Sequence, residues 1–140
     1  MIVLDTDHLS CLEWGSEESA NLRARLAEAS DRKIVVSIAS YEEQMRGWMA
    51  LLAKTPDVKK QVEAYSRLRK HLQLYCSIPL LDFSELAADK FIELRRQKIR
   101  IGTMDLKLAA SCLCENALLL TRNTIDYSKI PGLRFEDWTR

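Results

Sequence analysis

Four acidic side chains stand at predicted boundaries between strands and helices, far apart in the sequence: Asp5, Glu43, Asp105 and Asp126. If they converge they repel one another strongly, because two unit charges about 4 Å apart interact by roughly 4 kcal/mol at an effective dielectric near 20. A bound cation offsets that repulsion. Carboxylate oxygens without histidine or cysteine ligands select Mg²⁺ or Mn²⁺ over zinc. The chemistry that uses such a site is phosphodiester hydrolysis, in which metal stabilises the attacking and leaving oxygens.

Each acid also has a structural explanation. Glu43 follows Ser40 by three residues, which is the spacing of a capping box at the start of a helix. Asp105 suits the first turn of a helix, where its charge complements the dipole, and Asp126 suits a loop held by side-chain to backbone bonds. Asp5 is harder to explain in this way, because a carboxylate that closes a buried apolar strand needs a partner or a cation.

Short apolar runs predict the strands that precede several of these acids. We expect strands at residues 2–4, 33–37, 78–82, 117–121 and 133–135. Pro79 places the third strand at a sheet edge or marks its first residues. Because helices of ten or more residues separate most of these strands, the pattern indicates an α/β layer fold with a mainly parallel sheet.

Capping residues and breaks mark where the helices begin and end. The first helix ends at Gly15, and residues 55–57 divide two long helices that form a hairpin. N-caps are predicted at Thr6 or Asp7, Ser16, Ser40 and Ser84, and a further helix restarts at residues 102–103. In open α/β sheets ligands bind beyond the carboxyl ends of the strands, where the strand order reverses. All four acids map near that edge.

The composition favours one compact soluble protein. Hydrophobic residues make up 47% and charged residues 29%, and the net charge is +1. This excludes the strong global basicity of proteins that bind nucleic acid by charge alone, so any RNA contact needs a local patch. We find no apolar run of the roughly 18 residues that indicate a membrane span and no signal segment, and we expect a cytoplasmic protein. The four cysteines form no CxxC pair and are expected to be reduced core thiols.

With these residues in place, the sequence resembles the PIN-domain family and, within it, the VapC-type toxins. Residues from about 55 to 76 match only as generic helix. The resemblance rests on residues 3–6, residues 37–40 with Glu43 and Gly47, residues 101–105 with 109–110, residues 120–127, residues 130–133 and residues 136–138.

This resemblance implies a PIN-like three-layer fold over a single domain of residues 1–140, with a mainly parallel central sheet of four to five strands flanked by helices. It implies a metal-dependent endoribonuclease, often one that cuts tRNA or another structured RNA, that dimerises and is held inactive by a VapB-like antitoxin. Asp5, Glu43, Asp105 and Asp126 carry over as catalytic, metal-binding acids. Thr6, Ser40 and Thr121 carry over as hydroxyls that support them.

The sequence departs from the family pattern at Asn123 and at Gln44, which follows Glu43 where an apolar residue is common. Asn123 stands where many relatives have an acid, so it is open which of Asn123 and Asp126 completes the site; Asp126 is our candidate ligand and Asn123 a supporting residue. Glu42 adjoins Glu43, and the spacing to Gly47 favours Glu43. Asp7 offers a further ligand or, as we expect, an N-cap.

A local basic patch could hold RNA phosphates beside the acids, although a solvated helix face explains it equally well. Its members are Arg95, Arg96, Lys98, Arg100, Lys107 and Arg122. Trp48 and Met49 are expected in the core, with a dimer surface as the alternative.

Two other functions start from different aspartates. Asp5-Thr6-Asp7 resembles the opening of haloacid-dehalogenase-like phosphatases, but Leu9 stands where that family has Thr or Val, and no later Asp-Asp pair follows. A non-catalytic receiver-type interaction module would need a phosphoacceptor, for which Asp82 is the candidate, but it has no clear lysine partner.

Overall fold

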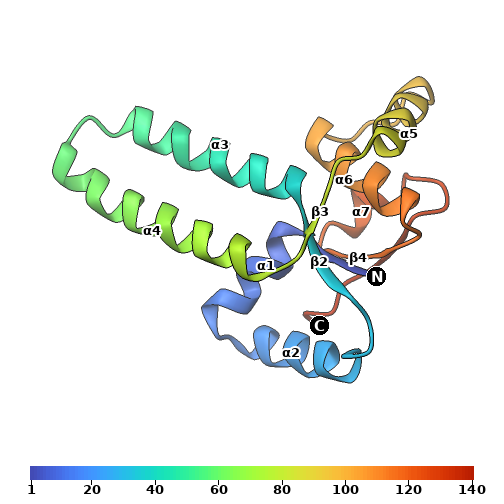
Figure 1. Ribbon diagram of the computed structural model, residues 1–140, viewed down its shortest axis with the longest axis horizontal. Coiled ribbons are helices and arrows are strands. Elements are labelled where there is room, and N and C mark those ends of the chain that lie inside the picture. The colour runs from blue at the N-terminus through green and yellow to red at the C-terminus, as the bar shows by residue number, and fades with distance from the viewer.

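A parallel sheet of five strands forms the centre of the molecule (Figure 1). The computed structural model describes residues 1–140, except the side chain of Trp14. The strand order is β3-β2-β1-β4-β5, and every neighbouring pair is parallel. The strands are β1 (Ile2–Leu4), β2 (Ile34–Ser37), β3 (Leu80–Leu81), β4 (Leu118–Leu120) and β5 (Arg134–Glu136). This confirms the predicted α/β fold, with β3 at an edge.

The central strands are buried on both faces, which explains why their sequences are unbroken apolar runs. Successive side chains of β1 point to opposite faces. Val3 packs into one core cluster with Leu119 of β4, whereas Ile2 and Leu4 pack into a second cluster with Leu22. Helices therefore cover both faces of the sheet, and the strand ends are held rigidly.

Seven helices within the described chain surround this sheet. The predicted N-caps at Ser16 and Ser84 are confirmed, and Gly15 ends the first helix with a left-handed φ of 57°. None of the helices in the described residues is both long and apolar enough to cross a bilayer. The helices are α1 (Thr6–Trp14), α2 (Glu17–Glu28), α3 (Ile38–Lys54), α4 (Val58–Ser77), α5 (Glu85–Arg96), α6 (Thr103–Cys114) and α7 (Thr124–Tyr127).

Two helices begin earlier than the sequence predicted. Asp5 itself is the N-cap of α1 and accepts a hydrogen bond from the Thr6 N–H, so the predicted caps at Thr6 or Asp7 are wrong. Ser37 caps α3 by accepting from the Ala39 N–H, so the predicted cap at Ser40 is also wrong. Asp5 directly follows β1 and Ser37 is the last residue of β2, so in both cases the strand end leads straight into the helix without a loop.

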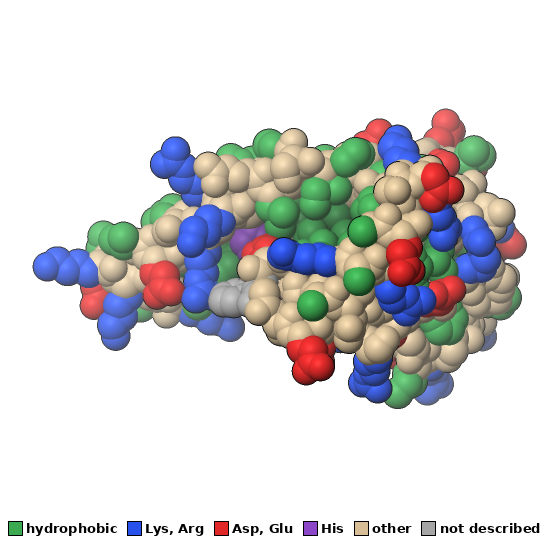
Figure 2. Space-filling model, turned by 90° about the horizontal axis from the view of Figure 1, so that it is seen from below, with side chains coloured by type: hydrophobic (Ala, Val, Ile, Leu, Met, Phe, Trp, Pro, Cys, Tyr) green, Lys and Arg blue, Asp and Glu red, His purple; other side chains and the backbone are tan. Residues whose placement is uncertain are grey.

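Helices α3 and α4 form the predicted hairpin, which projects away from the sheet on the left of Figure 1. Several large apolar side chains of the hairpin are exposed, including Met49, which is 56% exposed, and Leu72, which is 52% exposed. The expectation that Met49 lies in the core is therefore wrong, while Trp48 is half-buried against His71. Lys and Arg side chains gather along the same hairpin (Figure 2).

The cysteines divide into two kinds. Cys11 and Cys112 are free thiols in the core, as expected. Cys76 and Cys114 are also free but exposed, so the expectation of core thiols is wrong for them. Both stand in the last turn of a helix, α4 and α6 respectively.

Candidate metal centre

The candidate site lies at the carboxyl edge of the sheet, where the strand order reverses at β1. Leu4 of β1 pairs with Leu120 of β4, so the next residues along each strand, Asp5 and Thr121, are neighbours. The backbone N–H of Asp5 donates to the carbonyl of Leu120 over 2.9 Å. The two central strands therefore fix the position of Asp5.

Asp5 is a buried carboxylate, only 6% exposed. Its Oδ1 accepts from the Thr6 N–H and its Oδ2 accepts from the Thr121 hydroxyl, both over 2.8 Å. Burial first, and then the charges of Asp7 and Asp105, raise the pKa of Asp5 to about 6, because the two hydrogen bonds that lower it do not offset them. The site therefore destabilises the ionised form of Asp5 unless a cation binds there.

Asp105 lies close enough to Glu43 for its charge to act on that carboxyl group. Partial burial raises the pKa of Glu43, and the charge of Asp105 adds to that rise. Burial also raises the pKa of Asp105, with further repulsion from Asp126 and Asp7, while a hydrogen bond of 3.1 Å from the Tyr127 hydroxyl opposes it. Since α3 does not begin at Ser40, the capping-box explanation of Glu43 fails.

Asp126 stands at the rim of the group. Its Oδ2 accepts from the Asn123 side-chain amide over 3.0 Å, and its Oδ1 pairs with Lys129 over 3.2 Å. These two contacts lower the pKa of Asp126. Asn123 and Asp126 thus form one unit, in which Asn123 also donates its backbone N–H to the Thr121 hydroxyl.

The three hydroxyl residues that we expected to support the acids differ in their contacts. Thr121 donates directly to Asp5. Thr6 reaches Asp5 through its backbone N–H. Ser40 is buried in the first turn of α3, on the helix that carries Glu43.

Asp7 and His8 form a contact that the sequence did not predict. The two side chains meet over 2.7 Å, between Asp7 Oδ1 and His8 Nδ1. Asp7 Oδ2 accepts the backbone N–H of Arg122 over 3.0 Å. Asp7 therefore ties α1 to the loop after β4. The only signal in the sequence was that both residues lie within three positions of Asp5.

The predicted basic residues fall into two groups. Arg122 pairs with Glu18 over 2.5 Å, and Lys107 lies 4.0 Å from Glu42, so these two cations already have acidic partners. The remaining four are exposed around the end of α5: Arg95, Arg96, Lys98 and Arg100.

The candidate donors are all carboxylates, which suit a hard dication better than zinc, and burial followed by the charges of neighbouring acids raises the pKa values of Asp5, Glu43 and Asp105. Among the described Asp, Glu, His and Cys side chains, no group of three already surrounds one ion position. An ion would therefore have to draw these carboxylates together, and the energy released on relieving their repulsion favours that movement.

Comparisons with known proteins agree with this fold. The family model for the PIN domain matches residues 2–133. Ribonuclease VapC2 of Rickettsia felis is 31% identical over 86 residues, which is 59% of this chain and 62% of that protein. The crystal structure of VapBC2 from Rickettsia felis bound to a promoter DNA fragment aligns with a TM-score of 0.67, at 22% identity, over 99% of both chains. A toxin-antitoxin complex from Klebsiella pneumoniae aligns with a TM-score of 0.61, at 24% identity, over 95% of both chains.

Proposed function

The chain belongs to the PIN domain family, and we propose that it is a metal-dependent endoribonuclease of the VapC-like toxin kind. The observation that carries this proposal is the position of Asp105 at the carboxyl edge of the sheet, where its charge acts on both Asp5 and Glu43. The similarity to a VapC ribonuclease supports the same activity.

The cofactor in this proposal is Mg²⁺ or Mn²⁺, held by Asp5, Glu43 and Asp105, with Asp126 and Asn123 at the rim. Bound there, such an ion would polarise the phosphoryl oxygens and lower the pKa of a water molecule that attacks the phosphodiester. The raised pKa values of the acids support this assignment, because carboxylates gathered without a cation repel one another.

The chain's own side chains would orient these acids. The Thr6 N–H and the Thr121 hydroxyl each hold one oxygen of Asp5, and each of these oxygens keeps a further lone pair for an ion. The Tyr127 hydroxyl holds Oδ1 of Asp105. Burial of Asp5 removes competing water. The exposed cations Arg95, Arg96, Lys98 and Arg100 would contact RNA phosphates, whereas Lys107 and Arg122 are partly neutralised by Glu42 and Glu18.

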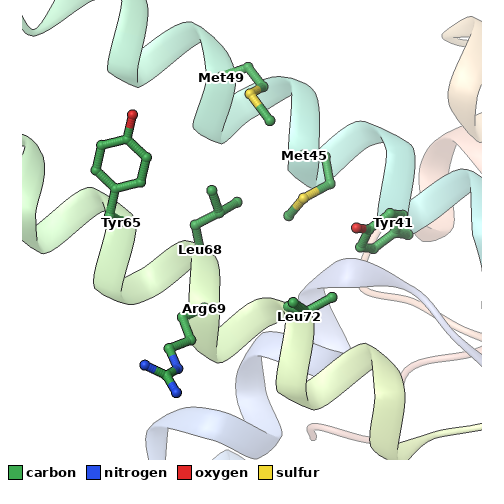
Figure 3. A pocket seen from close by; sticks show the side chains of 7 residues that line it. All are labelled: Tyr41, Met45, Met49, Tyr65, Leu68, Arg69 and Leu72. Carbon is green, nitrogen blue, oxygen red and sulfur yellow. The ribbon is translucent and has the colours of Figure 1, made fainter.

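A VapB-like antitoxin is the proposed partner. An apolar groove of about 370 Å³ lies between α3 and α4. In Figure 3, Met45 and Met49 of α3 face Leu68 and Leu72 of α4, with Arg69 at the margin. Amphipathic helices bind such grooves, and methionine adapts its shape to them. Similarity to a toxin-antitoxin complex supports this partner, and the exposed apolar face also fits the expected homodimer.

The other two functions considered from the sequence have less support. The haloacid-dehalogenase mechanism needs Asp7 free as an acid-base group, yet both its oxygens accept hydrogen bonds. Asp82 follows the edge strand β3 and is exposed. It is not among the residues whose charges act on Asp5.

The direct test is cleavage of RNA by the purified chain with Mg²⁺ or Mn²⁺, compared with excess chelator. Glu43→Gln should abolish cleavage, whereas Glu42→Gln, the matched neighbour paired with Arg46 and Lys107, should retain it. Cleavage that persists in chelator or in Asp5→Asn would refute the proposal. If Glu42→Gln loses cleavage while Glu43→Gln keeps it, Glu42 is the metal ligand and Glu43 is not.

A further inference from the structure

His8 is a fully buried polar side chain in the first turn of α1. Its two ring nitrogens have different partners. Nδ1 lies 2.7 Å from Asp7 Oδ1, and Nε2 accepts the backbone N–H of Trp138 over 3.1 Å. The ring therefore connects the acidic site to the chain segment that follows β5.

The Trp138 contact selects the tautomer of the ring. A backbone N–H can only donate, so Nε2 must present a lone pair. The neutral ring then carries its proton on Nδ1, which donates to Asp7. The opposite tautomer would place two donors against each other at Nε2 and leave Nδ1 without a proton for Asp7.

The donating backbone is itself held in place. The Trp138 indole N–H donates to Glu136 over 2.6 Å, and the Arg25 guanidinium lies 4.5 Å from the centre of the indole ring. Asp137, whose Oδ1 is 3.6 Å from His8 Nε2, accepts from both the backbone N–H and the hydroxyl of Thr139. The segment thus presents its N–H to His8 in a fixed direction.

Asp7 links His8 to the candidate metal site through its second carboxylate oxygen. Its second oxygen accepts the Arg122 N–H and lies 3.4 Å from the Thr121 hydroxyl. That hydroxyl is the group that donates to Asp5. The charge of Asp7 also acts on Asp5 and Asp105.

We propose that His8 is a positioning residue for the metal site: the backbone at Trp138 sets its tautomer, and its Nδ1–H holds the Asp7 carboxylate against Thr121 beside Asp5. This inference rests on the proposed metal-dependent function. The residues that hold metal-binding carboxylates in place typically change metal affinity by about tenfold or more when they are replaced.

Two substitutions separate the bonds of His8. In His8→Asn the side-chain amide can still donate to Asp7, but it does not reach Trp138. In His8→Gln the longer side chain can accept from Trp138, but it does not donate to Asp7 from the Nδ1 position. Calorimetry with Mn²⁺ should give His8→Asn an affinity within about twofold of wild type and His8→Gln an affinity about tenfold weaker.

A double-mutant cycle tests whether His8 acts through Asp7. In an Asp7→Ala background, His8→Gln should weaken Mn²⁺ binding no further. If His8 only stabilises the fold, the Mn²⁺ affinity of each variant should instead fall with its melting temperature. His8→Gln should then weaken Mn²⁺ binding equally whether residue 7 is Asp or Ala. Nitrogen-15 NMR of the labelled protein should show His8 with its proton on Nδ1.

Equal Mn²⁺ affinity in His8→Gln and wild type, an additive loss in the Asp7→Ala background, or a proton on Nε2 would each overturn the role of His8. Wild-type protein that binds no Mn²⁺ and cleaves no RNA would instead overturn the proposed function itself. These two failures are distinguishable, because the role of His8 is tested on variants only after the wild-type protein has been shown to bind Mn²⁺.

Discussion

The hydroxyl of Thr121 donates a hydrogen bond of 2.8 Å to Asp5 Oδ2 and so joins the end of β4 to the end of β1. This bond lowers the pKa of Asp5, yet burial and the charges of Asp7 and Asp105 together still raise it to about 6. The ionised form of Asp5 is therefore held in the folded chain at a cost. The fold keeps this carboxylate in place despite its effect on stability, which is typical of functional sites.

Replacing Asp5 with Asn should stabilise the metal-free protein at neutral pH. The pKa of Asp5 is raised from 3.8 to about 6 on folding, so the folded state binds the proton more tightly, and stability falls as pH rises from about 4 to about 6. Because one pKa unit corresponds to about 1.4 kcal/mol, the penalty above pH 6 is roughly 3 kcal/mol. Urea unfolding in chelator should show a gain for Asp5→Asn that is larger at pH 7.5 than at pH 4.5.

The control for this substitution is Asp57→Asn, which replaces an exposed N-cap with another good cap. Its effect on unfolding should differ little between the two pH values. If Asp5→Asn shows the same change at pH 4.5 and pH 7.5, ionised Asp5 does not destabilise the fold.

Binding of Mn²⁺ should strengthen as pH rises from about 5 to about 7. Protons compete with the ion for carboxylates whose pKa values are raised: that of Asp5 to about 6, and those of Glu43 and Asp105 above their ordinary values. The Mn²⁺-induced rise in melting temperature should likewise be larger at pH 7 than at pH 5. An affinity that does not change over this interval would exclude Asp5 from the ligands.

The sequence predicted the sheet well because its strands are buried on both faces. Residues 2–4 and 118–120 are continuous apolar runs, a pattern that depends on the layer architecture and hardly on particular contacts. The position of Asp5 followed from the first of these runs, and that of Asp105 from the predicted helix start at residues 102–103. Helix starts were less predictable, since Ser37 and Ser40 are both good caps and only the folded strand shows which one is at its end.

The contacts of Asp7 and His8 lay beyond the sequence for a different reason. They join the first turn of α1 to Arg122 and Trp138, and no local pattern in the sequence encodes that long-range pairing. The exposure of the α3–α4 hairpin was likewise not predictable from the sequence. The period of three and four predicted the helix of Val62 and Leu72, but it did not show that both side chains would remain exposed.

Asp105→Asn should weaken Mn²⁺ binding more than Asp126→Asn does. Asp105 is partly buried and acts on Glu43 and Asp5, whereas Asp126 already accepts hydrogen bonds from Asn123 and Lys129. Losing a supporting group typically costs about tenfold or more in metal affinity, and losing a direct ligand should cost more than that. Calorimetry on the two variants makes the comparison. A larger loss in Asp126→Asn would identify Asp126 as a primary ligand.

Tyr127→Phe should weaken metal binding by Asp105, while the aromatic ring still fills the same space in the core. Tyr127 is fully buried, and its hydroxyl donates to Asp105 Oδ1 over 3.1 Å. Without this donor the pKa of Asp105 should rise further, so Mn²⁺ binding should require a higher pH, and stability should fall by about 1 kcal/mol. The exposed Tyr65→Phe is the control. An unchanged pH profile of Mn²⁺ binding in Tyr127→Phe would show that the hydroxyl does not act on the site.

Charges placed in the α3–α4 groove should separate partner binding from catalysis. Met49→Glu and Leu72→Glu replace side chains that are 56% and 52% exposed, so each should change stability by less than about 0.5 kcal/mol. RNA cleavage should persist, whereas inhibition by a VapB-like antitoxin should weaken by about tenfold or more, because a buried interface anchor contributes over 1 kcal/mol. Ile125→Glu on α7, where the side chain is 78% exposed outside the groove, should leave inhibition unchanged. Full inhibition of both groove variants would place the antitoxin on another surface.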